Sequence, residues 1–146
     1  MRTRSISKRS VLALLCVILT GVATAYAAEY EISGTVETIE LGPIYLSIYD
    51  AAGFDDEEPI LSLVIDAEDA ADGTAEFSFT GLDAGVYAIR VFQDLNGNEF
   101  VDIGRFGPAE PTGFYATPPI LQRPPHFDEV AFELNGDIGD IVIELR

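Results

Sequence analysis

The sequence predicts an all-β fold: a single antiparallel β-sandwich of about seven strands with one long loop lobe rich in proline and glycine. Apolar and polar residues alternate in seven short segments, which is the pattern of strands buried on one face. No segment of useful length has the 3.6-residue apolar spacing of a helix, and the one short candidate, residues 67–71, runs into Asp72-Gly73. Seven short strands separated by turns are typical of a β-sandwich.

The first strand is expected at residues 30–37, where Ile32 and Val36 share one face and polar residues share the other. Six further strands are expected at residues 44–49, 61–66, 75–79, 86–92, 130–134 and 141–145. The strand residues expected to face the core are Phe77, Phe79, Tyr87, Ile89, Val91, Phe132, Leu134, Ile141, Ile143 and Leu145. Aromatic residues in such an alternation are more often core than ligand platform.

Two glycine-bearing connections are expected to be structural turns. In residues 80–85, the two glycines can take positive φ, and Leu82 is expected to close one end of the sandwich. Residues 135–140 are expected to form a hairpin connection that makes the last two strands antiparallel neighbours.

The interval from Leu95 to Glu129 is the irregular part of the chain and holds six of its eight prolines. Loops of this length in compact domains are either functional or disordered. This one has enough apolar residues to pack against the sandwich, among them Phe106, Phe114 and Tyr115. We therefore expect an ordered lobe, with residues 94–102 at its root.

The N-terminus has the features of a cleaved signal peptide. Four basic residues among the first nine precede an apolar run over residues 11–23, and Ala25 and Ala27 suit signal peptidase. We expect cleavage after Ala27, a sandwich domain at residues 28–146, no membrane span after cleavage, and a periplasmic or secreted protein. Cys16 would be removed with the signal, so disulfides and thiol chemistry would not contribute.

The chain is strongly acidic, with 25 acidic and eight basic residues and a formal net charge of −17. All 25 acidic residues but only four basic ones lie beyond position 27, so the mature charge would be −21. Such a surface repels nucleic acid and anionic lipid, which excludes them as general partners. The acidic run at residues 55–58 is interpreted as a solvated loop, with a cation-collecting surface as the alternative.

The segment from Asp94 to Asp102 carries the strongest functional signal. Asp94, Asn96, Asn98 and Asp102 place side-chain oxygens at positions 1, 3, 5 and 9 of a tight loop. Calcium binds six to eight oxygens, and alternate residues of such a loop can direct them to a common centre. These four residues are therefore candidate Ca²⁺ ligands.

Two positions depart from the usual calcium loop. Glu99 stands where a glycine would make the sharp turn, and Arg105 occupies the twelfth position, where a bidentate glutamate is usual. The alternative is an Asn-Gly turn in which the Asp and Asn side chains bond their own backbone without any metal.

The sequence offers little for catalysis. His126 is the only histidine, no cysteine follows residue 27, and neither a nucleophilic triad nor a zinc site can be assembled. His126 is expected at the surface, or paired locally with Asp128. A carboxylate-based hydrolase is carried as an outside alternative, because any acidic protein offers many carboxylate pairs.

Three stretches carry a resemblance to a known family: residues 81–98 with Asp102, residues 107–114 (GPAEPTGF) and residues 127–132 (FDEVAF). Together they resemble the exported bacterial family catalogued as domain of unknown function 2141, over essentially the whole mature chain. The family pattern has glycine where this chain has Glu99. The resemblance implies export and an immunoglobulin-like or prealbumin-like sandwich, similar to carboxypeptidase-regulatory modules, and supplies no activity.

The function expected from the sequence is an exported, non-catalytic β-sandwich module, stabilised by calcium, that binds an envelope or extracellular ligand. The alternative is a protein that binds glycan or another envelope component through exposed aromatic residues of the lobe. The residues that would form this platform are Phe106, Phe114 and Tyr115.

Overall fold

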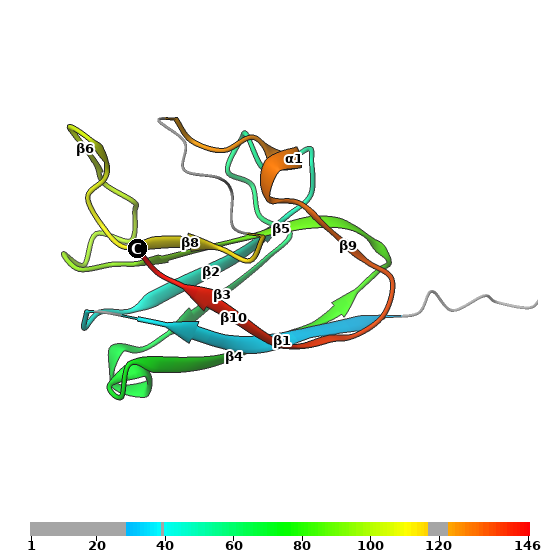
Figure 1. Ribbon diagram of the computed structural model, residues 1–146, viewed down its shortest axis with the longest axis horizontal. Helices are drawn as coiled ribbons and strands as arrows, with labels where there is room; N and C mark the ends of the chain where they lie inside the picture. Colours follow the sequence, from blue (N-terminus) through cyan, green and yellow to red (C-terminus); the bar gives the residue numbers. More distant parts are fainter. Residues whose placement is uncertain (1–28, 39, 117–122) are drawn as a thin grey trace, which may run out of the picture.

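The computed structural model describes residues 29–38, 40–116 and 123–146. The chain is a β-sandwich of two main sheets (Figure 1), as the alternating pattern predicts. Its elements are β1 (Tyr30–Glu37), β2 (Ile44–Tyr49), β3 (Leu61–Ile65), the 3-10 turn η1 (Ala67–Ala70), β4 (Thr74–Leu82), β5 (Gly85–Gln93), β6 (Ile103–Gly104), β7 (Gly107–Pro108), β8 (Thr112–Phe114), α1 (Phe127–Val130), β9 (Phe132–Leu134) and β10 (Ile138–Glu144). One sheet has the order β10-β1-β4 and the other β3-β2-β5-β8, while β9 pairs with β5 and β6 pairs with β7.

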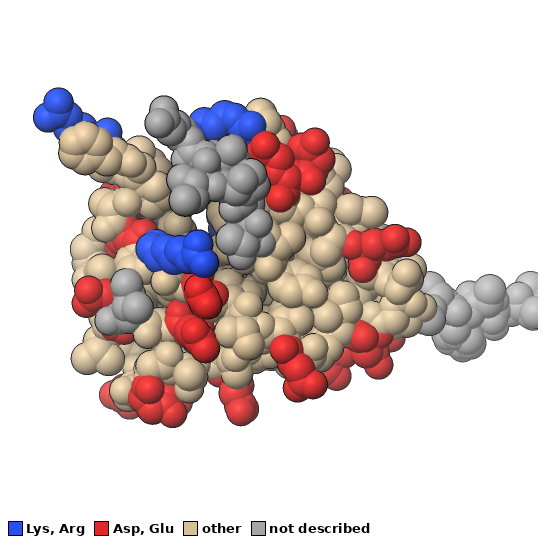
Figure 2. All heavy atoms as spheres, viewed as in Figure 1, with Lys and Arg blue, Asp and Glu red and all other residues tan. Residues whose placement is uncertain are grey.

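The core lies between the two sheets and includes the residues that the alternation assigned to it, together with Ile44, Leu46 and Ile48 of β2. Ile32, Val36, Ile89 and Val91 are completely buried, and the other expected core residues belong to the same cluster, with Phe132 partly buried. Polar residues on the opposite faces stay in contact with solvent, and carboxylates are spread over the visible surface (Figure 2). Burial of one face per strand therefore accounts for the sandwich.

The expected hairpin between the last two strands is wrong. β9 pairs antiparallel with β5, whereas β10 pairs parallel with β1 at the edge of the other sheet. Both strands carry buried apolar residues, and placing them in different sheets lets each sheet cover its own part of the core. The connection crosses between the sheets, where Asp137 Oδ1 accepts the backbone N–H of Glu31 at 2.9 Å.

The turn at residues 80–85 is shorter than expected, because β4 and β5 extend into it until only Asp83 and Ala84 separate them. Gly81 has the expected positive φ of 78°, but Gly85 does not. Leu82 is 2% exposed and closes this end of the sandwich as expected.

The described parts of the interval 95–129 are structured. They contain the small β6–β7 hairpin, strand β8 and helix α1, whereas residues 117–122 lie outside the described part. β8 was missed because it has only three residues and a central glycine. Gly113 is needed there, since a Cβ would lie 2.7 Å from the backbone oxygen of Glu144.

Among the described residues, no helix has the length and apolar character needed to cross a membrane. The expected signal peptide at residues 1–27 lies outside the described residues.

Candidate metal centre

The candidate loop begins at the C-terminal end of the buried strand β5, whose last residue is held in place by hydrogen bonds. Gln93, the last residue of β5, is fully buried and its side-chain amide donates to the carbonyl oxygens of Glu40 at 2.8 Å and Gly42 at 3.2 Å. The backbone N–H of Asp94 donates to the Pro43 carbonyl at 2.9 Å. These bonds place the Asp94 carboxylate, which is 2% exposed, beneath the loop that follows.

The Asp94 carboxylate collects the backbone N–H groups of the loop. Its Oδ1 accepts from Asn96 at 3.2 Å, Gly97 at 2.7 Å and Asn98 at 3.3 Å, and its Oδ2 accepts from Glu99 at 2.9 Å. Burial alone would raise the pKa of Asp94, but these four N–H groups lower it below its ordinary value. The loop is therefore folded around an ionised carboxylate.

The two asparagines continue the same arrangement outward. Asn96 Oδ1 accepts the N–H of Asn98 at 3.0 Å, and Asn98 Oδ1 accepts the N–H of Phe100 at 2.9 Å. Their side-chain amides both donate to Asp102 Oδ2, at 2.6 Å from Asn96 and 3.0 Å from Asn98. The four candidate ligands thus belong to one hydrogen-bonded loop, in which the Asn96 and Asn98 side chains converge on a single oxygen of Asp102.

The structure shows where both departures from the usual calcium pattern lie. Gly97 has φ 78° and Glu99 has φ 66°, so the sharp turn falls at Glu99, where a non-glycine residue is strained. Arg105 lies in the turn between β6 and β7 and is a cation, so it supplies no ligand.

Glu110 belongs to the site and was not found by sequence reasoning. It is 5% exposed; its Oε1 accepts the N–H of Leu95 at 2.9 Å, and its Oε2 accepts the N–H of Asp102 at 3.2 Å. One buried carboxylate thus joins the beginning and the end of the loop. The signal was present in the residues 107–114 that carry the family resemblance, but a contact across 15 residues of irregular chain cannot be derived from spacing.

The oxygen ligands of the loop suit a hard cation that is bound with modest affinity. Within residues 29–38, 40–116 and 123–146 there is no group of three His, Cys, Asp or Glu side chains placed to hold a metal. The loop instead offers two carboxylates, Asp94 and Asp102, and the amide oxygens of Asn96 and Asn98. Oxygen ligands of this kind suit Ca²⁺, and the low number of charges implies weak binding.

The aromatic candidates do not share one surface. Phe106 is 94% exposed in the β6–β7 turn. Phe114 is partly buried against the small cluster formed by Tyr49, Phe54, Ala88 and Val130. Tyr115 packs against the main core, with its ring 4.8 Å from that of Phe132.

His126 is exposed, as expected, and lies immediately before helix α1. Its backbone N–H donates to Glu129 Oε2 at 2.8 Å rather than its side chain pairing with Asp128. Glu129 also accepts two bonds from the Arg123 guanidinium, at 2.8 and 2.9 Å. The Arg123 bonds and then the His126 N–H lower the pKa of Glu129 to about 2, which makes it a structural anion at the start of the helix.

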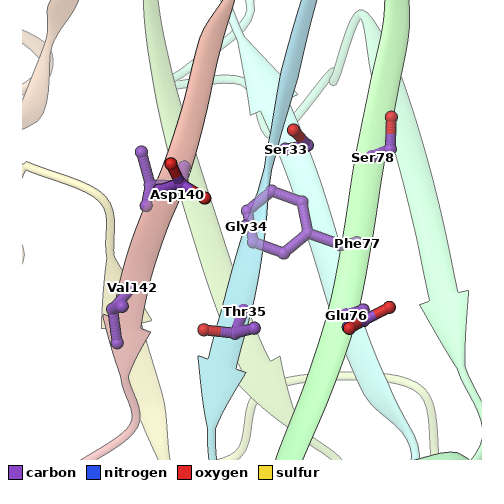
Figure 3. A pocket seen from close by; sticks show the side chains of 9 residues that line it. Ser33, Gly34, Thr35, Glu76, Phe77, Ser78, Asp140 and Val142 are labelled. Atoms are coloured by element: carbon purple, nitrogen blue, oxygen red, sulfur yellow. The ribbon is translucent and has the colours of Figure 1, made fainter.

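A shallow groove lies on the outer face of the sheet β10-β1-β4 (Figure 3). Hydroxyl groups of Ser33, Thr35 and Ser78 line it, and its carboxylates come from Glu76 on β4 and Asp140 on β10. Strand β1 lies between those two strands, so the backbones of β4 and β10 are two strand spacings apart, roughly 10 Å.

Comparison with known proteins identifies the family. A model of the family described as an uncharacterized protein conserved in bacteria, DUF2141, matches residues 35–141. No curated protein and no solved structure matches the chain. The matched region runs from β1 to β10 and includes the Asp94–Asp102 loop and Glu110, so the chain belongs to the DUF2141 family.

Proposed function

We propose that this protein is an exported, non-catalytic β-sandwich module whose Asp94–Asp102 loop binds calcium. Bound calcium would hold the segment after β5 against the sheets and so stabilise the module for a binding role at the cell envelope. The observation that carries this proposal is the convergence of the Asn96 and Asn98 side chains on Asp102 Oδ2. A cation at that centre would displace the two amide N–H groups that share this oxygen, and the amides would turn so that their Oδ1 atoms face the cation.

The charges of the site support calcium of low affinity. Asp94 is ionised, and Asp102 supplies a second carboxylate at the outer end of the loop. Sites with few charged ligands in extracellular modules have dissociation constants of about 0.1–1 mM. Such a site would be filled only where calcium is plentiful, which fits a location outside the cytoplasm.

Two observations support a non-catalytic role. Among the described residues, the carboxyl groups with displaced pKa values are Asp94 and Glu129, and both have a lowered pKa, whereas a general acid needs a raised one. In the groove of Figure 3, Glu76 and Asp140 come from strands that are not neighbours, because β1 lies between β4 and β10, so they do not form a directly paired set of carboxylates.

Glycan binding through Phe106, Phe114 and Tyr115 has weaker support. A platform must present ring faces to solvent, and only Phe106 is highly exposed, while the other two rings pack against separate clusters.

The test is thermal unfolding of residues 28–146 across a calcium titration at fixed ionic strength, with magnesium as the ion control. With a dissociation constant of 1 mM, 10 mM calcium would stabilise the protein by about 1.4 kcal/mol, which raises Tm by roughly 5 °C. Asp102→Asn should remove this rise, because it removes a charged ligand while keeping an oxygen that can accept the two amide bonds.

Asp72→Asn is the matched control, since Asp72 is an exposed aspartate whose Oδ1 alone accepts bonds, from the Thr74 backbone and hydroxyl. It makes the same charge change away from the loop and should keep the calcium response. A flat titration, an equal response to magnesium, or an undiminished rise in Asp102→Asn would each contradict the proposal.

A further inference from the structure

The β6–β7 hairpin projects beyond the sandwich from the outer end of the Asp94–Asp102 loop (Figure 1). Ile103 pairs with Pro108 and Gly104 with Gly107, which leaves Arg105 and Phe106 as the two-residue turn. The hairpin is closed at its base by the Ala109 N–H, which donates to the Asp102 carbonyl at 2.7 Å. Arg105 and Phe106, at the end of the hairpin, are therefore held in place by the paired strands β6 and β7.

The hairpin and the loop residue before it expose an unusual amount of apolar surface. Phe106 is 94% exposed, Ile103 75% and Phe100 73%, and these are the three most exposed large hydrophobic side chains of the described residues. They lie within seven positions of one another. We call Phe100, Ile103, Arg105 and Phe106 the apolar tip. Single exposed hydrophobic residues need no explanation, but a concentration on a projecting hairpin marks an interaction site.

Charge distinguishes the tip from the remaining surface. The described residues contain four arginines, and three of them form ion pairs: Arg90 with Glu57 at 3.2 Å, Arg123 with Glu129 at 2.8 Å and Arg146 with Glu144 at 3.1 Å.

The fourth arginine, Arg105, makes no ion pair with a described carboxylate, and its guanidinium lies 5.4 Å from the centre of the Phe106 ring. Residues 103–109, which begin directly after the exposed Asp102, contain no acidic residue, in a chain whose formal charge is −17. The apolar tip therefore presents a cation and apolar side chains together. A surface that matches it has anionic groups on the outside and an apolar layer beneath them.

We propose that the apolar tip inserts into the interface of a phospholipid bilayer. Phe106, Ile103 and Phe100 would lie at the boundary between headgroups and acyl chains, and Arg105 would contact lipid phosphate. A convex, projecting shape suits a fluid surface that can close around it. This interaction goes beyond the proposed calcium site and does not require a metal.

The acidic body decides which lipid is favoured. A zwitterionic headgroup has no net charge but contains an anionic phosphate. Its phosphate can therefore bind Arg105 while the bilayer as a whole does not repel the carboxylates of the sandwich. Anionic bilayers repel that body at low salt, and this repulsion is screened over about 8–10 Å at moderate salt. Binding should therefore be stronger to phosphatidylcholine than to phosphatidylglycerol vesicles in low salt, and the difference should shrink as salt is added.

The chain has no tryptophan, so a single introduced tryptophan reports on its own surroundings. In residues 28–146, which contain every described strand and the whole described core, Phe106→Trp should show a blue-shifted emission when phosphatidylcholine vesicles are added. Val86→Trp is the control, because Val86 is 51% exposed at the opposite end of β5, roughly 25 Å from the loop. Its emission should stay unchanged.

Vesicle co-sedimentation then measures the energetic role of the tip. Full transfer of a phenylalanine side chain from water is worth about one to two orders of magnitude in an equilibrium constant, so Phe106→Ser should bind at least tenfold more weakly. Val86→Ser should bind like the unchanged protein. Both substitutions remove an exposed apolar side chain and leave the core intact.

The proposal is overturned if the Phe106→Trp emission is unchanged at saturating lipid, if Val86→Trp shifts equally, or if Phe106→Ser keeps its affinity. The first outcome would show that the tip does not enter the bilayer. The vesicle experiments are done in calcium and in chelator, and insertion in either buffer supports the proposal. Because the calcium melting experiment contains no lipid, failure of either proposal leaves the other one open to test.

Discussion

Replacing Asp94 by Asn tests whether one buried carboxylate organises the loop. An asparagine has nearly the same shape but only one acceptor oxygen, whereas Asp94 uses Oδ1 for the N–H of Gly97 and Oδ2 for that of Glu99, at 2.7 and 2.9 Å. Whichever way the new amide is turned, its nitrogen faces a backbone donor.

The cost follows from these bonds. A buried donor left without an acceptor costs about 1–3 kcal/mol. The bonds that remain lose their charge assistance, which removes about another 1 kcal/mol because ionic bonds are roughly twice as strong as neutral ones. Asp94→Asn should therefore destabilise the protein by about 3 kcal/mol, which corresponds to a Tm roughly 10 °C lower for a domain of this size.

The assay is urea unfolding in chelator, followed by circular dichroism, with Asp50→Asn as the control. Asp50 accepts the N–H groups of Ala52 at 3.0 Å and Gly53 at 2.8 Å through Oδ1 alone, so an asparagine can keep both bonds. The control makes the same charge change and should cost less than about 0.5 kcal/mol. Equal stabilities of the two variants would refute the reasoning.

The pH dependence gives a second check. Since the pKa of Asp94 is lowered by folding from an ordinary value of 3.8, its stabilisation is complete above that value and is lost as the pH falls towards the folded pKa. The difference between the unchanged protein and Asp94→Asn should be constant from pH 7 to 5 and shrink below about pH 4. A difference that stays constant down to pH 3 would contradict ionisation as its cause.

Two further substitutions test the backbone. Gly34→Ala should destabilise the protein by about 3 kcal/mol or prevent folding, since the new Cβ would clash with the backbone oxygen of Ile141 in the paired strand. Gly139→Ala, whose Cβ would approach nothing closer than 3.9 Å, is the control in the same urea experiment. Glu99→Gly should increase the free energy of unfolding by up to about 1 kcal/mol, and so raise Tm slightly, because it relieves the strain of the positive φ of 66°. A lower Tm in chelator would show that the Glu99 side chain stabilises the protein by more than its backbone strain costs.

The structure changes how the calcium site must be tested. Asp94 binds four backbone N–H groups, so removing it destabilises the protein whether or not metal is present. Asp102 is exposed and accepts only side-chain amides within the loop, which is why it can report on calcium. The alternative of a turn that satisfies its own backbone and the calcium hypothesis use the same residues.

The strands and the core could be predicted from the sequence because a strand that is buried on one face has apolar residues at every second position. Pairing could not be predicted in the same way. β9 and β10 are separated by three residues, yet they pair with β5 and β1, and nothing local distinguishes this crossing from a hairpin.

The candidate site, like the fold, could be predicted only where it depends on residues close together in the chain. Alternate oxygen-bearing residues identified Asp94 and its partners, since they lie close together in the chain. Glu110 could not be found, because its contacts with Leu95 and Asp102 depend on the path of the intervening hairpin. The exposure of Phe106 also depends on that hairpin, whereas composition alone favoured packing of all the loop aromatics.

The parallel pairing of β1 with β10 has a consequence for how the protein reaches its native state. The first strand of the sandwich depends on the last one, and Glu31 bonds to Asp137, 106 positions later. Closing so long a loop is slow, and it cannot begin while residues 138–144 are still being synthesised. The β1–β10 pairing therefore cannot form until residues 138–144 have been made, and until then β1 is paired on one edge only, with β4.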